Sequence, residues 1–386
     1  MKTIFLISIL IIMYTYIGYA IIIFILVRLS GRHKVVYHQK ELLSVTLIVP
    51  CFNEGKALEE KIKNTFDLEY PKELLQLIFV CDGSSDGSEQ IPMKYDQILT
   101  LFSPERKGKL AAMKRAVSYS EGDILVFCDG NTVLNKEALL NIVQPYADNR
   151  VGAVTGEKYI LSDPEDSASS VGEGMYWKYE SFLKKYDSFF YTVVGGAGEL
   201  MSYRKTLFEF LPDNTILDDF MLTMKIAEKG YLVKYVPEAR ASEYASSNVE
   251  EETKRKIRIA AGGWQSISRL PKAINPFHDW KLTFQYISHR VLRWTVTPFL
   301  MILVFVLNHL LPLENPLFLT LLIGQYLFYF LSFLGYLLQN RSVPIPGFFL
   351  PFYLNVMNYS AIRGLFRWLS NSQAVTWERA KRANED

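Results

Sequence analysis

Acidic and amide side chains cluster directly after three short apolar segments of this 386-residue chain. The clusters are Asn53 with Glu54, Asp82 with Asp86, and Asp129 with Asn131. Carboxylate and amide oxygens accept hydrogen bonds from polar ligands and coordinate hard divalent cations. Each cluster alone also matches an ordinary turn, because Asp, Asn and Gly favour turns. Their recurrence along the chain favours one shared binding site over three unrelated turns.

The apolar segments before these clusters are expected to be buried strands that bring the polar groups together. They are Val45–Pro50, Leu75–Val80 and Asp123–Gly130. Helical patterns follow from about Lys56 and over Lys109–Tyr119. Near-continuous apolar strands between helices indicate a mostly parallel sheet with helices on both faces. Ligands bind such sheets at the carboxyl ends of the strands, so an α/β ligand-binding domain is predicted.

The composition fits a folded soluble part joined to membrane segments. Hydrophobic residues reach 49%, while charged residues still make up 21%. The net charge of +2 provides no large basic field, which argues against a nucleic-acid partner. Three cysteines are too few for a disulfide framework, so Cys51, Cys81 and Cys128 are predicted to be buried thiols. The soluble part is therefore expected in the reducing cytosol.

The first apolar stretch, Ile4–Val27, carries no charge and is long enough to span a bilayer. It is longer than the apolar core of a secretory signal peptide, which favours an uncleaved anchor. Basic residues follow it, and the positive-inside tendency places that flank in the cytoplasm. These residues are Arg28, Arg32, His33 and Lys34.

The C-terminal third contains further membrane candidates. Trp294–Leu311 and Leu317–Leu338 are expected to span, and Arg341 returns the chain to the cytoplasm. Pro346–Leu369 is ambiguous because its Asn and Arg side chains are costly in lipid, and a re-entrant or interfacial placement is expected. Phe277–Val291 has an apolar face at helical spacing, which predicts a helix in the membrane surface or, alternatively, against the soluble domain.

The expected organisation has five parts. They are an anchor (1–28), the α/β domain (43–271), an amphipathic interfacial helix (274–291), a transmembrane or re-entrant region (294–369) and a cytoplasmic tail (370–386).

Five motifs in order resemble the signature series of family 2 glycosyltransferases, whose domain has the GT-A fold. They are VTLIVPCFNEG, FVCDGSSDGS, ERKGKLAAMKRA, ILVFCDGNT and ILDDF, within about residues 45–265. The flanking membrane segments are similar to the bacterial subset of cellulose, chitin-oligosaccharide, hyaluronan and poly-N-acetylglucosamine synthases. The resemblance implies a nucleotide-sugar donor and a divalent metal, Mg²⁺ or Mn²⁺. It does not specify the sugar.

For the donor, the resemblance implies that Asp82 hydrogen-bonds the nucleobase, and a uracil imide would suit a carboxylate. Pro50, Asn53 and Glu54 would shape the same pocket and contact the ribose. Lys107 and Lys109 would approach the donor, although this basic segment also fits a solvated turn.

For the metal, the resemblance implies Asp129 and the residue two positions later. The family usually has Asp-x-Asp, whereas this chain has Asn131. An amide oxygen can coordinate a hard cation but adds no negative charge, so weaker metal binding is expected. Asn131 would alternatively hydrogen-bond the donor.

For the transfer itself, the resemblance implies that Asp219, the second residue of the Asp218–Asp219 pair, is the general base. The pair would also suit a helix N-terminus, which is compatible with catalysis. The glycine-rich segment that holds Gly196, Gly198 and Glu199 is expected to bind the acceptor.

One motif departs from the family. Processive members carry Gln-x-x-Arg-Trp near the membrane, and this chain has Arg255, Arg258 and Ile259 at those positions. Arg258 would still hold the diphosphate, or it would belong to a basic helix face at lipid headgroups. The missing tryptophan argues against processive synthesis.

The leading hypothesis is an inverting, metal-dependent glycosyltransferase at the cytoplasmic membrane face, acting in cell-surface polysaccharide synthesis. It would move a sugar, with UDP-sugar as the expected donor, to a saccharide or lipid-linked saccharide acceptor beside membrane lipids. A processive synthase is the first alternative, and a non-catalytic membrane sensor of nucleotide sugars is the second.

Overall fold

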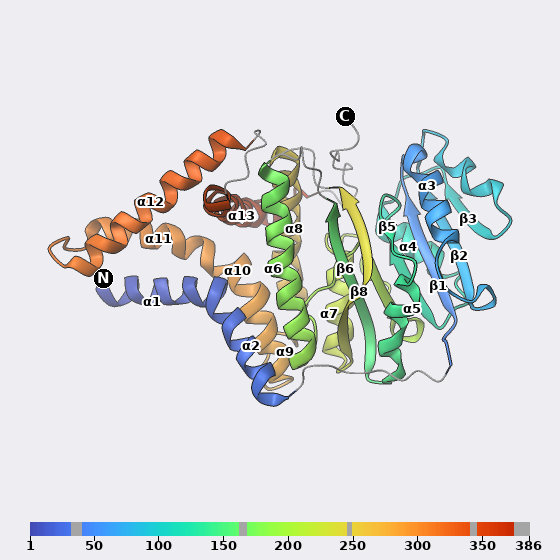
Figure 1. The fold of residues 1–386 in the computed structure, drawn as a ribbon, viewed down its shortest axis with the longest axis horizontal. Helices are drawn as coiled ribbons and strands as arrows, with labels where there is room; N and C mark the ends of the chain where they lie inside the picture. The colour runs from blue at the N-terminus through green and yellow to red at the C-terminus, as the bar shows by residue number, and fades with distance from the viewer. Residues whose placement is uncertain (32–40, 162–167, 245–248, 340–345, 374–386) are drawn as a thin grey trace.

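The structure is a computed structural model that describes residues 1–31, 41–161, 168–244, 249–339 and 346–373. The basic residues 32–34, Arg341 and the tail from residue 374 onward lie outside the described residues. Figure 1 shows a sheet domain at one end, a layer of long helices beside it, and apolar helices that extend away from both.

The domain is built on an eight-stranded sheet, within the part of the chain that is described, with strand order β3-β2-β1-β4-β7-β6-β8-β5. The pairs β1–β2, β2–β3, β1–β4 and β6–β8 are parallel, and the pairs that involve β7 or β5 are antiparallel. The sheet is therefore mixed, with the expected parallel arrangement concentrated in its N-terminal half. The strands are β1 (Val45–Cys51), β2 (Leu75–Asp82), β3 (Ile98–Ser103), β4 (Ile124–Cys128), β5 (Val133–Leu134), β6 (Val151–Leu161), β7 (Leu200–Arg204) and β8 (Leu232–Tyr244).

The central strands are apolar throughout because both of their faces are buried. Ile48 joins one hydrophobic core, while its neighbours Leu47 and Val49 join another on the opposite face. The first core includes residues of α4 (Lys109–Val117) and α7 (Asp218–Glu228). The second includes residues of α3 (Gly55–Phe66) and α5 (Ala138–Val143). The three cysteines are free and buried, as predicted.

The register brings the polar strand ends together. Cys51 pairs with Cys81, so the turns after β1 and β2 leave the sheet at the same edge. Ile48 pairs with Phe127, which places the end of β4 on the other side of β1. Asp82 and Asp129 therefore end two strands that flank β1.

A layer of helices covers the sheet on the side away from β3 (Figure 1). It contains α6 (Ala168–Phe190), α8 (Val249–Arg269), α13 (Pro346–Leu369), α2 (Tyr19–Ser30), α9 (Trp280–Tyr286) and α10 (Leu292–Trp294). Beyond this layer, α1 (Lys2–Met13), α11 (Val296–Leu310) and α12 (Pro316–Leu338) extend away from the sheet. Two π-helical turns, Tyr14–Gly18 and Ile287–Val291, interrupt this region, and the Tyr14 hydroxyl meets Ser288 Oγ at 2.7 Å.

Two described helical stretches are long and apolar enough to cross a membrane, Lys2–Ser30 and Pro316–Leu338. They contain the predicted spans Ile4–Val27 and Leu317–Leu338. The predicted span Trp294–Leu311 corresponds to α11, which reaches spanning length only together with Trp280–Trp294, across a bend of 52°. Spanning itself stays a prediction.

Residues 346–369 form α13, which is not among these candidates within the described residues. Its polar side chains pair with neighbouring helices, because Asn355 donates to Ser332 Oγ at 2.8 Å and Asn358 donates to the Tyr16 hydroxyl at 2.8 Å. A re-entrant or interfacial placement therefore remains a prediction.

The predicted amphipathic segment is helical from Trp280, and it packs against the sheet domain. Leu282 and Tyr286 are buried in the core that also holds α7. Gln285 and His289, which the pattern assigns to a polar face, are buried as well. Asp187 of α6 explains this, because it accepts from the Gln285 amide at 3.2 Å and pairs with His289 at 2.6 Å. A place in the membrane surface stays a prediction for Phe277, whose side chain is 98% exposed.

Candidate active site

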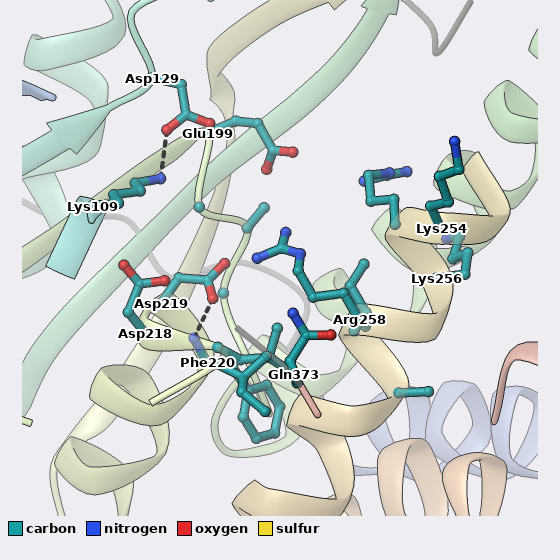
Figure 2. A pocket seen from close by; sticks show the side chains of 18 of the residues that line it. Lys109, Asp129, Glu199, Asp218, Asp219, Phe220, Lys254, Lys256, Arg258 and Gln373 are labelled. Atoms are coloured by element: carbon teal, nitrogen blue, oxygen red, sulfur yellow. Dashed lines mark hydrogen bonds and ion pairs between the residues drawn. The ribbon is translucent and has the colours of Figure 1, made fainter. Parts of the chain in front are cut away.

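One cavity of about 700 Å³ lies where the strand ends of the sheet meet α7 and the helical layer. It brings together most of the residues predicted from the sequence, and Figure 2 shows part of this group. The predicted residues that line it are Pro50, Glu54, Asp82, Lys109, Asp129, Asn131, Gly196, Gly198, Glu199, Asp218, Asp219 and Arg258.

Asn53 and Lys107 are not part of this lining. The Asn53 side chain accepts from the Ser85 backbone N–H at 2.9 Å, which ties the turn after β1 to the turn after β2. The Lys107 ammonium lies 3.1 Å from Glu105 at an exposed position. Both side chains therefore lie in turns outside the lining, while the backbone N–H of Lys107 donates to Asp82 of the lining. Their donor contacts stay a prediction.

Asp82 is buried at the end of β2 and is held by three donors. Its Oδ2 accepts from the backbone N–H groups of Lys107 at 2.8 Å and Gly108 at 2.6 Å, and its Oδ1 lies 3.3 Å from the Arg115 guanidinium. Arg115 lies in the motif ERKGKLAAMKRA, and the sequence analysis did not single it out. These bonds fix the carboxylate at the wall of the cavity, with fewer acceptor positions left for a nucleobase.

Lys109 and Asp129 form an ion pair of 2.5 Å in the cavity (Figure 2). Burial alone would lower the pKa of Lys109, but Asp129 and then Asp218 hold this pKa above its ordinary value. Asn131 lines the same region. Glu54 reaches it from the turn between β1 and α3, since a Cβ added at Gly130 would lie 1.9 Å from Glu54 Oε2. Within the described residues, no group of three His, Cys, Asp or Glu side chains could hold a metal by itself.

Asp218 and Asp219 form the first turn of α7 and point into the cavity (Figure 2). Asp219 Oδ1 accepts from the Phe220 backbone N–H at 2.7 Å. Its other oxygen faces Gly198, where an added Cβ would come within 2.8 Å of Oδ2. Burial, followed by the charge of Asp218, raises the pKa of Asp219 to about 6. That value suits a group that accepts a proton near neutral pH.

Arg258 of α8 extends toward the same carboxylates (Figure 2). Burial lowers the pKa of its guanidinium, while Asp218 and Asp219 oppose this change. Seven residues further along the same helix, Gln265 accepts from the Ile216 backbone N–H at 3.0 Å and donates to the Asn214 carbonyl at 2.8 Å. Gln265 thus fixes the loop that leads into Asp218.

Glu199 is one of the residues that the sequence predicts to bind the acceptor. Its carboxylate pairs with the buried Lys158 at 2.6 Å. Burial would raise the pKa of Glu199, but Lys158 lowers it well below its usual range, so Glu199 is ionised. Tyr176 and Trp177 of α6, which the sequence did not single out, line the cavity beside it.

Comparisons with known proteins bear on this arrangement. The family model described as "Glycosyl transferase family 2" matches residues 46–211. Poly-beta-1,6-N-acetyl-D-glucosamine synthase of Staphylococcus aureus (strain COL) is 24% identical over 258 residues, which cover 63% of this chain and 60% of that protein. Probable glycosyltransferase YdaM of Bacillus subtilis (strain 168) is 24% identical over 247 residues, 58% of this chain and 56% of that protein. The chain thus spans less than two thirds of the curated relatives that it matches.

A solved mannosyltransferase, PcManGT from Pyrobaculum calidifontis in complex with GDP-Man and Mn²⁺, shares the fold with a TM-score of 0.69. It is 20% identical and covers 96% of this chain and 100% of its own. The mixed sheet, its covering helices and the acidic strand ends define a GT-A domain. Over residues 46–211 the chain is similar to family 2 glycosyltransferases.

Proposed function

We propose that this protein transfers a sugar from a nucleotide-diphosphate donor to an acceptor hydroxyl, with inversion at the anomeric carbon. The observation that carries the proposal is the presence of Asp82, Asp129 and Asp219 in the lining of one cavity, from three separate elements. Lys109 and Arg258 supply positive charge in the same cavity. The match of residues 46–211 to the family 2 glycosyltransferase model supports the reaction class.

In the proposed reaction, Asp219 Oδ2 removes the proton from the acceptor hydroxyl. The acceptor oxygen attacks the anomeric carbon from one face, and the bond from that carbon to the diphosphate breaks on the other. The negative charge that develops on the diphosphate is stabilised by Lys109 and Arg258, whose cations are held in place before the reaction. A single displacement of this kind inverts the configuration.

A divalent metal fits this site only together with the donor. Asp129 and Asn131 would supply oxygen ligands, and Asp129 also pairs with Lys109 at 2.5 Å. Bound Mg²⁺ or Mn²⁺ would supply Lewis-acid stabilisation of the leaving diphosphate. The similar mannosyltransferase was solved with Mn²⁺, which supports the proposal.

For the donor we propose a UDP-sugar. The Staphylococcus relatives are named for a polymer of N-acetylglucosamine, whereas the similar mannosyltransferase was solved with GDP-Man. GDP-Man is a nucleotide-diphosphate sugar, which supports a donor of this class.

We further propose that the reaction occurs at the cytoplasmic face of the membrane, within cell-surface polysaccharide synthesis, on a saccharide or lipid-linked saccharide. The apolar helices that extend from the helical layer support membrane attachment. A processive polysaccharide synthase is the second candidate, favoured by the names of the Staphylococcus relatives.

The test is to incubate the purified full chain with UDP-N-acetylglucosamine, UDP-glucose and GDP-mannose, each with Mn²⁺ and with EDTA. Release of nucleotide diphosphate, a product of matching mass and an inverted anomeric signal by NMR support the proposal. Loss of release in EDTA supports the metal. Donor binding without release from any donor would instead indicate a nucleotide-sugar sensor.

A further inference from the structure

Arg290 connects the helical layer to the glycine-rich loop (194–199) beside the proposed base. It lies in the π-helical turn Ile287–Val291 and lines the cavity, and its side chain is 12% exposed. Its Nε donates to the Val194 carbonyl at 3.1 Å, and a terminal nitrogen pairs with Glu180 of α6 at 2.9 Å. A guanidinium carries several donors in one fixed plane, so a single side chain can hold both groups at once. The proposed sugar transfer assigns no role to Arg290.

Val194 begins the glycine-rich loop, which packs directly on the start of α7. A Cβ at Gly195, whose φ is +95°, would clash with the Phe220 ring. A Cβ at Gly198 would lie 2.8 Å from Asp219 Oδ2. Because the loop backbone lies so close to the carboxylate, a displacement of the loop would change the surroundings of the proposed base.

The Glu180 carboxylate that holds Arg290 is itself fixed by two more basic side chains. It pairs with Arg293 of α10 and lies 3.3 Å from His289, which in turn pairs with Asp187 at 2.6 Å. Burial would raise the pKa of Glu180, but the two arginines and His289 hold it well below its usual range, so Glu180 is ionised. The charges of the two arginines are balanced by the two carboxylates. Such a paired buried network holds its members rigidly, which suits the support of a neighbouring loop.

The same network reaches the N-terminal apolar helix. Asp187 accepts a hydrogen bond from the Tyr19 hydroxyl, and Tyr19 begins α2 within the candidate span Lys2–Ser30. Both side chains are fully buried. The Tyr14 hydroxyl of the same span meets Ser288 Oγ in the π-helical turn itself. A continuous path of paired side chains therefore runs from the N-terminal helix to the glycine-rich loop.

We infer that Arg290 is a positioning residue that holds the glycine-rich loop in place beside Asp219, and that Tyr19 supports it through the paired network. The inference rests on the proposed function, because the loop affects the transfer through the Asp219 carboxylate. Arg290 acts through the loop, whereas the donor side of the cavity is formed by the strand ends that carry Asp82 and Asp129. Loss of Arg290 should therefore slow the transfer and leave donor binding nearly unchanged.

The test combines hydrogen–deuterium exchange of residues 194–199 with steady-state nucleotide release, both on the purified full chain in detergent. Arg290→Met should speed exchange of the loop amides. It should also lower kcat about tenfold or more, because small displacements at a reacting centre are costly, while the donor KM changes less than about twofold. Arg290→Lys keeps a charge opposite Glu180 but offers one compact ammonium, so it should show the same two defects. Arg240→Met is the matched control, because Arg240 is exposed and outside the cavity lining, and it should match the wild type.

Three results would overturn the inference. The first is equal exchange of the loop in the wild type and Arg290→Met. The second is full recovery of loop exchange and kcat by Arg290→Lys, since charge alone would then suffice. The third is unchanged loop exchange in Tyr19→Phe, which removes only the donor to Asp187 and should speed exchange by a smaller factor than Arg290→Met.

Exchange is measured without donor, so it tests the positioning role separately from the proposed reaction. Faster loop exchange in Arg290→Met, together with a wild type that releases no nucleotide from any donor, would contradict the proposed function and leave the link between Arg290 and the loop intact. Normal nucleotide release with unchanged loop exchange would contradict the positioning role alone.

Discussion

At the scale of single residues, the environment of Asp219 determines when the proposed base can work. Its pKa is raised to about 6, first by burial and then by Asp218. A base must be ionised, so activity should rise with pH through about 6 and level off near pH 7. At pH 5, about one tenth of the molecules would carry the ionised form. The measurement is kcat/KM for nucleotide release between pH 4.5 and 8.5.

Asp218→Asn supplies the control for this profile. Removing that charge takes away the second cause of the shift, so the acid limb should move below pH 6. Burial remains, and the limb should stay above the ordinary range of an aspartate. An acid limb that does not move would show that Asp219 is not the group that titrates.

Gly198 leaves room for the Asp219 carboxylate. A Cβ at this position would lie 2.8 Å from Oδ2 and 3.3 Å from Cγ. Gly198→Ala should therefore displace the base and lower kcat at least about tenfold, a loss within the range of general-base catalysis. The KM for the donor should change little. Steady-state kinetics with varied donor test this, and an unchanged kcat would mean that the oxygen facing Gly198 is not used.

The strand ends alone predicted Asp82 and Asp129 as site residues, whereas Asp218, Asp219 and Gly198 were expected from the resemblance to family 2 glycosyltransferases. Asp82 and Asp129 close apolar strands, and Asp219 begins a helix, so their placement depends on local pattern. Asn53 and Lys107 lie in turns outside the cavity lining, where they contact Ser85 and Glu105. Turn conformation depends on such partners, which a linear motif does not identify.

At the scale of elements, the contact between α8 and α13 positions Arg258. A Cβ at Gly364 of α13 would lie 2.5 Å from the Ala260 Cβ and 2.7 Å from the Ala261 backbone nitrogen. Gly364→Leu should force the helices apart and destabilise the fold by about 1–3 kcal/mol. Arg258 precedes this contact by two residues, so nucleotide release should fall as well.

Gly324→Leu is the matched control, because a Cβ on this glycine of α12 meets nothing within 4 Å. The measurements are the thermal unfolding midpoint in detergent and the rate of nucleotide release. Equal midpoints for the two variants would contradict the close packing of α8 on α13.

The parallel half of the sheet was predictable because its strands are short, apolar and followed by helices. The other half was not, since β6 pairs with β8 over register shifts and β7 enters antiparallel between β4 and β6. These pairings join residues far apart in the chain, such as Val151 and Leu232. The alternation of apolar residues shows which face of a strand is buried, but it does not identify the neighbouring strand in the sheet.

At the scale of the whole molecule, the proposed orientation puts the sheet domain in the cytoplasm and the turn between α11 and α12 outside. The native cysteines are buried, so cysteines introduced at exposed positions can be labelled selectively. Glu314→Cys should react with an impermeant maleimide in intact cells, whereas Asp213→Cys should react only after the membrane is opened. Labelling of Asp213→Cys in intact cells would reverse the orientation.

The cavity as a whole was the least predictable feature. Its walls come from the strand ends, α6, α8, the π-helical turn near Arg290 and α13, which are separated by tens to hundreds of residues. The amphipathic pattern of residues 277–291 fitted both the membrane surface and the soluble domain. Its polar residues Gln285 and His289 are buried because they pair with Asp187 in the interior. When polar side chains are buried in hydrogen-bonded networks, a helix no longer has one polar exposed face and one apolar buried face. Sequence patterns detect buried helix faces by that difference.

The most direct test of the central claim compares Asp219→Asn with Asp213→Asn in nucleotide release and in donor binding. Asp213 is the control because its side chain is 87% exposed and does not line the cavity. The account predicts that Asp219→Asn lowers the rate by about 10²- to 10⁴-fold while donor affinity is retained. Asp213→Asn should match the wild type in both. Wild-type turnover by Asp219→Asn would contradict the assignment of Asp219 as the base in a shared donor and acceptor cavity.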